Sequence, residues 1–199
     1  MCGHFALDPV NYDSHDQLGM DGGTLSFRTA SRIRPTESIS LLLSGPSGLT
    51  VEQRRWGVDT PQASRPVINA RLETLAERPL FRPALGHRQC LIPATAWFEW
   101  RVEGRDKVGY RFSPGAGSFW HFAGLWWPPS EAQPQGGAVI VTCAAVSEVT
   151  AYHHRMPLCL SGASARAWLD GEMAVPTASW QGKVQPMDPH RPVQTTLFD

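Results

Sequence analysis

Apolar stretches rich in aromatic and β-branched residues recur along the chain, and they predict a protein built mainly of β-strands. Residues 38–43 (SISLLL) and 51–58 (VEQRRWGV) lie on either side of the turn sequence SGPSG and predict two neighbouring strands. Further segments of the same composition are separated by Gly or Pro, and they cover residues 90–102, 109–113, 118–127 and 137–145. We therefore expect strands to dominate the fold.

Helical patterns are few and short. Residues 161–171 (SGASARAWLDG) predict a helix, and residues 147–154 predict a shorter helical stretch. Residues 73–89 have a helical composition, but Pro79 and Pro83 break it into short turns or a helix that starts near Pro79. Strands and helices do not alternate regularly. The prediction is an α+β fold with a curled, mostly antiparallel β-sheet or open barrel and short flanking helices.

The length of 199 residues suits a single domain, and the chain has no internal repeat. We assign residues 1–184 to this domain. Residues 185–199 (QPMDPHRPVQTTLFD) form a polar, proline-containing tail in this interpretation.

Composition excludes several classes of protein. Hydrophobic residues make up 42% of the chain, which is enough for a core. No apolar run approaches the ~20 residues of a membrane span. The start of the chain lacks the basic and apolar regions of a signal peptide. We therefore expect a cytoplasmic or nucleoid-associated monomer with no membrane partner.

The formal net charge is zero, so no global field favours an anionic partner. The basic residues are nevertheless uneven, because Lys107 and Lys183 are the only lysines among 18 basic residues. A GC-rich genome accounts for such an excess of arginine. The alternative is that arginine was selected to contact phosphates and bases. Clusters in FRTASRIRP and EQRRWG lean towards this alternative.

Cys2 differs from the other cysteines. Cys90, Cys143 and Cys159 lie in apolar segments without metal-ligand spacing, and we expect them to be buried thiols. Cys2 follows the initiator Met, and it is small enough for an aminopeptidase to remove Met1. The mature chain would then begin with an amine and a thiol on adjacent carbons.

That pair of groups supports two reactions. An α-amine has a pKa of ~7.7–8.0, so a large share of it is neutral near pH 7.5 and adds to an aldehyde. The thiol then closes a five-membered thiazolidine in an intramolecular step. Alternatively, the thiolate attacks an acyl carbon, as in N-terminal nucleophile hydrolases. The plain alternative is that Cys2 is an incidental second residue.

Three other segments contain polar groups that suit such chemistry. Asn69 in PVINARLET is able to hold the Cys2 backbone or a substrate oxygen, or else it bonds its own backbone in a loop. Glu99 in an aromatic strand would have a raised pKa and act as acid and base, unless it faces outward and pairs with Arg101 or another Arg. His153 and His154 in AYHHRMPLCL are able to move protons near neutrality or are a surface pair.

Other site classes lack support in the sequence. Cys2-x-His4 and His87-x-x-Cys90 have ligand types but no zinc pattern, and no HExxH occurs. The chain also has no GxGxxG, GxxxxGK[ST] or GxSxG segment. We therefore expect no metal and no cofactor.

Four blocks in order carry a resemblance to a known family: MCG at the start, INAR.ET, IPA..WFEW and H.RMP. Each block is weak alone, but the set is specific, spans most of the chain and resembles the SRAP family, the SOS response-associated peptidases. The resemblance implies a single α+β domain with a positive groove for single-stranded DNA. It also implies a thiazolidine crosslink between the N-terminal Cys and a ring-opened abasic site. Members have also been described as peptidases that remove their own N-terminal segment.

The resemblance implies roles for individual residues. Cys2 matches the nucleophile, Asn69 the residue that orients it, Glu99 the proton-handling carboxyl and His153 the residue that contacts the opened sugar. The positions that match DNA-phosphate or base-stacking contacts are Arg71, Thr142, Arg155, Trp56 and Pro35.

The chain departs from the family pattern around the predicted groove. His4 replaces the usual Arg of MCGR, and we count it among the DNA-binding candidates. Arg32 stands in for an Asn, the loop VDTPQASRP lacks a Trp, and the usual C-terminal block is replaced by QPMDPHRPVQ. The four catalytic candidates remain.

Three hypotheses follow from these residues. The leading one is an abasic-site sensor that crosslinks to single-stranded DNA in the SOS response. The second is an N-terminal-Cys peptidase or amidohydrolase, including self-processing, that uses the same residues. The third is a noncatalytic module that binds single-stranded DNA.

Overall fold

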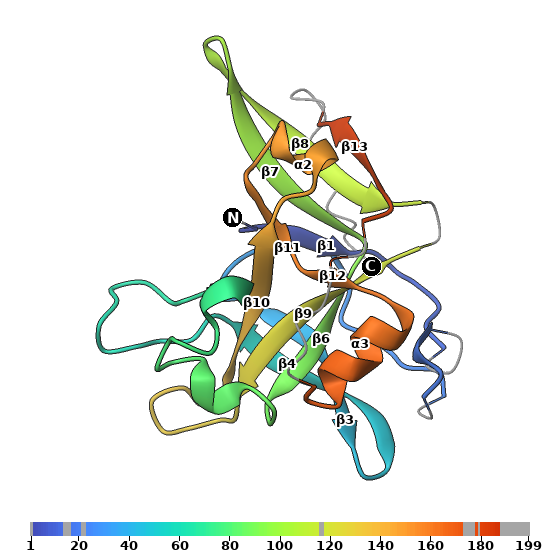
Figure 1. Ribbon diagram of the computed structural model, residues 1–199, viewed down its shortest axis with the longest axis vertical. Helices are drawn as coiled ribbons and strands as arrows, with labels where there is room; N and C mark the ends of the chain where they lie inside the picture. Colours follow the sequence, from blue (N-terminus) through green and yellow to red (C-terminus); the bar gives the residue numbers. More distant parts are fainter. Residues whose placement is uncertain are drawn as a thin grey trace, which may run out of the picture.

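The structure is a computed structural model of the chain, and it describes residues 2–13, 17–20, 23–115, 118–172, 178 and 180–187. Within these residues the strands form two sheets, and the helices are short (Figure 1). This confirms the predicted α+β class with a mostly antiparallel sheet.

The larger sheet curls. Its strands follow the order β11-β10-β4-β3-β6-β9-β12, and β10 also pairs with β9, which brings the two parts of the sheet together. Pairing is antiparallel except that β10 runs parallel to β4 and β5. The bounds are β3 Ser38–Gly45, β4 Gly48–Trp56, β5 Asn69–Arg71, β6 Gln89–Ala94, β9 Trp120–Trp127, β10 Gly137–Ala144, β11 Arg155–Pro157 and β12 Cys159–Leu160.

The smaller sheet is antiparallel throughout, in the order β13-β8-β7-β1-β2. Its bounds are β1 Phe5–Leu7, β2 Ala30–Ile33, β7 Ala96–Glu103, β8 Asp106–Pro114 and β13 Gly182–Pro186. The hairpin of β7 and β8 extends away from the rest of the molecule (Figure 1). The predicted segment 90–102 is thus two strands, because the chain leaves the larger sheet after β6 and enters the smaller one at β7.

Aromatic side chains join the two sheets. Trp97 on β7 stacks on Phe112 of β8 with ring centroids 4.9 Å apart. Phe5 on β1 meets Trp56 of the larger sheet edge-on at 5.2 Å, and it meets Phe122 at 6.0 Å. All five side chains are fully buried or nearly so. The core therefore lies between the sheets, and one face of each strand in the smaller sheet supplies it.

Both segments predicted to be helical contain a helix in the structure. Helix α3 (Gly162–Leu169) packs on the larger sheet, where Trp168 donates a hydrogen bond to the carbonyl of Cys90. Helix α2 (Ser147–Thr150) is one short turn. The proline-interrupted segment after Asn69 forms the 3₁₀ turns η1 (Leu72–Thr74) and η2 (Arg82–Ala84) rather than a helix.

The predicted start of the tail is too early, because residues 185 and 186 belong to β13 and pair with β8. Residues 188–199 of the predicted tail lie outside the described residues. In the part of the chain that is described, no helix is both long and apolar enough to cross a membrane.

Candidate functional site

Cys2 is fully buried three residues before β1, where the two sheets meet. β1 runs between β7 and β2, and the backbone N–H of Phe98 donates to the carbonyl of His4 at 3.0 Å. Because Phe5 is opposite Trp97 in this antiparallel pair, the segment before Phe5 runs alongside the part of β7 that contains Glu99. The sheet register therefore places the N-terminal cysteine beside the predicted acid.

Asn69 contacts Cys2 directly. It begins β5, which pairs with the central strand β10, and its Nδ2 donates to the Cys2 carbonyl at 2.9 Å. The other amide atom, Oδ1, is buried and has no hydrogen-bond partner among the described residues. The alternative of a loop Asn bonded to its own backbone is wrong, because the amide reaches across to the first strand.

Glu99 points from β7 into the same region. Its side chain shares a face with Trp97, and the residue is only 7% exposed. Burial raises the pKa of its carboxyl above the usual range. The alternative of an outward Glu paired with Arg101 is wrong, because Arg101 donates to Glu103 at 2.9 Å.

The carboxyl of Glu99 affects the pKa of the Cys2 thiol. Burial raises the pKa of the thiol strongly, and the nearby Glu99 charge raises it further. Cys2 Sγ also lies 3.6 Å from the carbonyl oxygen of His4. The thiol is therefore held in its neutral form beside a carboxyl whose pKa is also raised.

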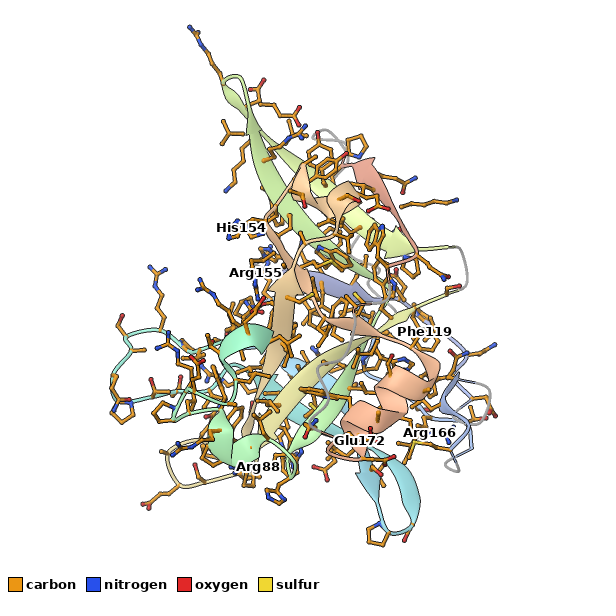
Figure 2. All side chains as sticks on the ribbon, viewed as in Figure 1. Arg88, Phe119, His154, Arg155, Arg166 and Glu172 are labelled. Carbon is orange, nitrogen blue, oxygen red and sulfur yellow. The ribbon has the colours of Figure 1, made fainter. Side chains whose placement is uncertain are left out.

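His153 and His154 lie between α2 and β11, with ring centroids 4.5 Å apart. The positive charge of His154 lowers the pKa of Glu99, in opposition to burial, so His154 lies within electrostatic range of this carboxyl. Figure 2 shows His154 and Arg155 where β11 begins. His154 is exposed and His153 half-buried, so at least one of them is a surface residue.

The backbone of Arg155 holds the ring of His153. The Arg155 N–H donates to Nδ1 at 2.9 Å, and the Arg155 carbonyl lies 3.0 Å from the same nitrogen. Nδ1 accepts from the N–H when it carries no proton and donates to the carbonyl when it is protonated. Burial lowers the pKa of His153. The ring is thus anchored through Nδ1 in either tautomer, and Nε2 is the atom that changes role.

Two residues predicted to contact phosphate are bonded inside the protein. Arg155 is 9% exposed, and its guanidinium donates to both carboxylate oxygens of Glu73, at 2.6 and 2.9 Å, and to the Thr142 carbonyl at 2.7 Å. Thr142 has no exposed surface. The polar groups of these two side chains are used inside the protein, and their contact with DNA stays a prediction. Arg71 is exposed and follows Asn69 on β5, where it is accessible to a ligand.

The predicted base-stacking residues are buried or half-buried. Trp56 is fully buried and donates from Nε1 to the carbonyl of Ile68 at 3.0 Å, and its role in base stacking stays a prediction. Pro35 is half-buried in the turn between β2 and β3. His4 is half-buried and meets Trp100 edge-on at 5.0 Å.

Sequence reasoning missed Glu73 and Trp100. Glu73 lies 82 residues from its partner Arg155, and no local pattern reveals such a pair. Trp100 is in the quoted WFEW block, and the strand alternation that puts Glu99 inside puts Trp100 on the opposite face. This alternation is the sequence signal that could have identified the position of Trp100. No group of three or more His, Cys, Asp or Glu side chains in the described ranges has the arrangement of a metal site.

These features define an α+β protein with a cysteine-centred site at the amino end of its chain. The profile of the family described as SOS response associated peptidase (SRAP) matches residues 1–196, so the chain belongs to the SRAP family.

Named relatives agree with this assignment. The chain is 29% identical over 201 residues to abasic site processing protein YoqW of Bacillus subtilis, covering 94% of this chain and 88% of that protein. It is 32% identical over 153 residues to abasic site processing protein YedK of Escherichia coli, covering 74% and 67% of the two chains. The crystal structure of a phage-related protein from Bordetella bronchiseptica has the same fold, with a TM-score of 0.75, 23% identity and 94% coverage of both chains.

Proposed function

We propose that this protein recognises abasic sites in single-stranded DNA and bonds to them through Cys2 once Met1 has been removed. The observation that carries the proposal is the grouping of Cys2, Asn69 and Glu99, in which the Asn69 amide holds the Cys2 backbone and a buried carboxyl faces the thiol. The relatives named as abasic site processing proteins support the same substrate.

The reaction starts at the amine, not at the thiol. With Met1 attached, the nitrogen of Cys2 is a non-nucleophilic amide; with Met1 removed, it is an amine with a pKa near ~7.7–8.0. Its neutral form adds to the aldehyde carbon of the ring-opened abasic sugar and gives a carbinolamine. The buried Asn69 Oδ1 is a suitable acceptor for an N–H of this amine, because its Nδ2 already fixes the carbonyl of the same residue.

Glu99 supplies the proton that the next step needs. The carbinolamine loses its hydroxyl as water when a carboxylic acid protonates it, and this leaves an iminium carbon. Burial raises the pKa of Glu99, which favours the protonated carboxylic acid that this step requires. The carboxylate that results then takes the thiol proton as Sγ bonds to the iminium carbon. The balance is one aldehyde and one aminothiol converted to one thiazolidine and one water.

His153 serves the opening of the sugar ring. Its Nδ1 is held by the backbone of Arg155, so Nε2 alternates between donor and acceptor without a change in ring position. Such a group is able to protonate the ring oxygen as the hemiacetal opens.

Acyl transfer by the Cys2 thiolate, the peptidase alternative, is less compatible with this site. A thiolate must form before it attacks an acyl carbon, and both burial and Glu99 oppose its formation. The crosslinking route needs the thiol only after the amine has reacted, when Glu99 has become its base. Release of Met1 by the chain itself is a separate reaction. The intact masses of the purified native protein and of the Glu99→Gln variant show whether Met1 is lost and whether its loss needs Glu99.

The decisive experiment uses an oligonucleotide with one abasic site. We expect the native protein, with Met1 shown to be absent by intact mass, to give an adduct that survives denaturation. Cys2→Ala should give none, whereas Cys143→Ala, a thiol substitution in the larger sheet, should retain it. Cys2→Ser keeps an amine and should give only an imine that borohydride traps. A stable adduct with Cys2→Ala would overturn the proposal.

A further inference from the structure

The strand carboxylates of the smaller sheet all lie on one of its two sides, together with Arg101, which pairs with Glu103. In the described strands, Trp97, Glu99 and Phe112 point towards the core side, and we call the opposite side of this sheet the outer face. Register places four side chains of strands β2, β7, β8 and β13 that carry positive charge on the outer face: Arg32, Lys107, Arg111 and Lys183. The strand carboxylates Glu99, Glu103 and Asp106 all belong to the other side.

A cavity of about 350 Å³ opens on this outer face near the end of β1. Two of the four cations, Arg111 and Lys183, line this cavity. The pairing of β13 with β8 brings them together, because Lys183 is opposite Ser113, two residues from Arg111, and Gln185 is opposite Arg111 itself. The polar groups of the lining that matter here are Asp8, Thr95, Arg111, Ser113, Lys183 and Gln185.

In this cavity Arg111 pairs with the carboxylate of Asp8, and the positive charge of Lys183 is not neutralised by a described carboxylate. Arg111 Nη2 lies 3.2 Å from Asp8 Oδ2, and the Thr95 hydroxyl donates to the same oxygen at 2.9 Å. Asp8 is therefore neutralised and fixed, and it in turn fixes the guanidinium. Lys183 is exposed and has no carboxylate partner among the described residues. An ammonium, a guanidinium with further N–H donors and the Ser113 hydroxyl together suit a phosphate group.

The amino-terminal segment of the chain connects the Cys2 site, on the core side of this sheet, to the cavity on the outer face. The same segment of chain leads from Cys2 to Asp8, a span of about 20 Å for an extended strand of this length. Between the two ends lie His4 and Arg32, and the Arg32 guanidinium is 5.9 Å from the ring of Phe98 and 6.0 Å from that of Trp100. A polyanion that leaves the Cys2 site along β1 thus passes cations and no unpaired strand carboxylate.

We infer that the Arg111–Lys183 cavity binds a backbone phosphate of the DNA strand that flanks the abasic site, several nucleotides away on one side. This inference rests on the proposed function, because it extends the DNA path from the Cys2 site. The contact is electrostatic and independent of base identity, so it adds affinity and not sequence preference.

The test varies the length of one flank at a time. Abasic oligonucleotides that extend in only the 5′ or only the 3′ direction are compared for half-saturating concentration with native protein, Lys183→Gln and the control Arg82→Gln, which removes an equal charge from an exposed 3₁₀ turn. For one polarity, affinity should rise once the flank reaches the cavity. Lys183→Gln should lose several-fold of this gain and lower the salt slope by about one. Arg82→Gln should keep both.

Amine footprinting gives a second readout, because the chain has only the two lysines. The long flank should protect Lys183 from an amine-reactive reagent, and Lys107 near the hairpin end serves as the internal reference. If Lys183→Gln matches native protein at every flank length and Lys183 is never protected, the inference is wrong. The proposed function is unaffected by that result, since a short oligonucleotide would still crosslink through Cys2.

Discussion

Glu99 and His121 are two buried titratable side chains in the same domain, and only one of them belongs to the candidate site. Both are nearly inaccessible, at 7% and 3% exposure. Burial opposes charge in both: it raises the pKa of Glu99 and lowers the pKa of His121 to about 4. A perturbed pKa is therefore shared by the two regions and does not by itself distinguish them.

The two residues differ in the groups that surround them. With the ring proton on Nδ1, His121 Nε2 accepts a hydrogen bond of 2.8 Å from the hydroxyl of Tyr12, and Phe119 packs edge-on against the imidazole at 5.3 Å. The neutral ring is thus satisfied by a neutral, unreactive partner. Glu99 faces the Cys2 thiol, next to the chain terminus where an amine can form. At His121 burial holds a neutral ring in the core, whereas in the proposed reaction burial favours the acid form of Glu99.

The largest effect should come from Glu99→Gln, which keeps the shape of the side chain and removes its proton chemistry. We expect the crosslinking rate to fall by ~10²–10⁴-fold, as for loss of a general acid and base. Single-turnover formation of the denaturation-resistant adduct measures it. The same variant should melt at a higher temperature at pH 8, because a carboxyl whose pKa is raised by burial lowers the stability of the folded state above its ordinary pKa, and an amide does not.

A fall in crosslinking rate together with a rise in melting temperature is specific to a functional carboxyl. A Glu99 that only supported the fold would lose stability on replacement, and the crosslinking rate would fall only with the folded fraction. A variant that melts lower at pH 8 and reacts normally once folded would remove Glu99 from the mechanism.

The second prediction concerns acid. Because the pKa of His121 is about 4 in the folded protein and 6.5 for the ordinary group, the unfolded chain binds more protons between these values. The free energy of unfolding should therefore decrease as the pH falls through this window, by about 2 kcal/mol from this residue between pH 7 and pH 5. Glu99 acts in the opposite direction, because a carboxyl with a raised pKa binds its proton more readily in the folded state.

Urea unfolding at pH 7 and pH 5 measures the sum, and His121→Gln isolates the histidine. This variant should be less stable at pH 7 but should lose less stability on acidification than the native protein. If the two proteins lose the same amount between the two pH values, His121 is not the group that titrates. Crosslinking by the folded fraction of the variant should be unchanged.

The strands could be predicted from sequence because alternation and turn residues are local. The β3–β4 hairpin around its Pro-Ser turn and the strands β9 and β10 follow from such patterns. The packing of side chains from distant segments could not. Trp56 has the composition of a stacking residue, yet the close approach of Phe5 and Ile68 makes it part of the core. Arg155 looks free until η1 brings Glu73 against it.

The candidate site was predictable to the extent that its residues occur in specific blocks. Cys2, Asn69 and Glu99 come from three of these blocks, and the structure brings them together through β1, β5 and β7. The DNA-facing residues were less predictable, since exposure decides whether an Arg or Trp contacts a ligand, and exposure depends on the whole fold.

The smallest effect should come from Tyr12→Phe, which tests the buried region without changing its shape. The variant loses the hydroxyl that donates to His121 Nε2 and leaves a buried acceptor without its partner. We expect a loss of about 1 kcal/mol in the free energy of unfolding, measured by urea titration at pH 7. The crosslinking rate should stay at the native value, since Tyr12 packs on Phe27, Phe119 and His121 and not on the Cys2 group. A drop in rate larger than the loss of folded protein would mean that the two regions are coupled, and the division between a stabilising histidine and a reactive carboxyl would then fail.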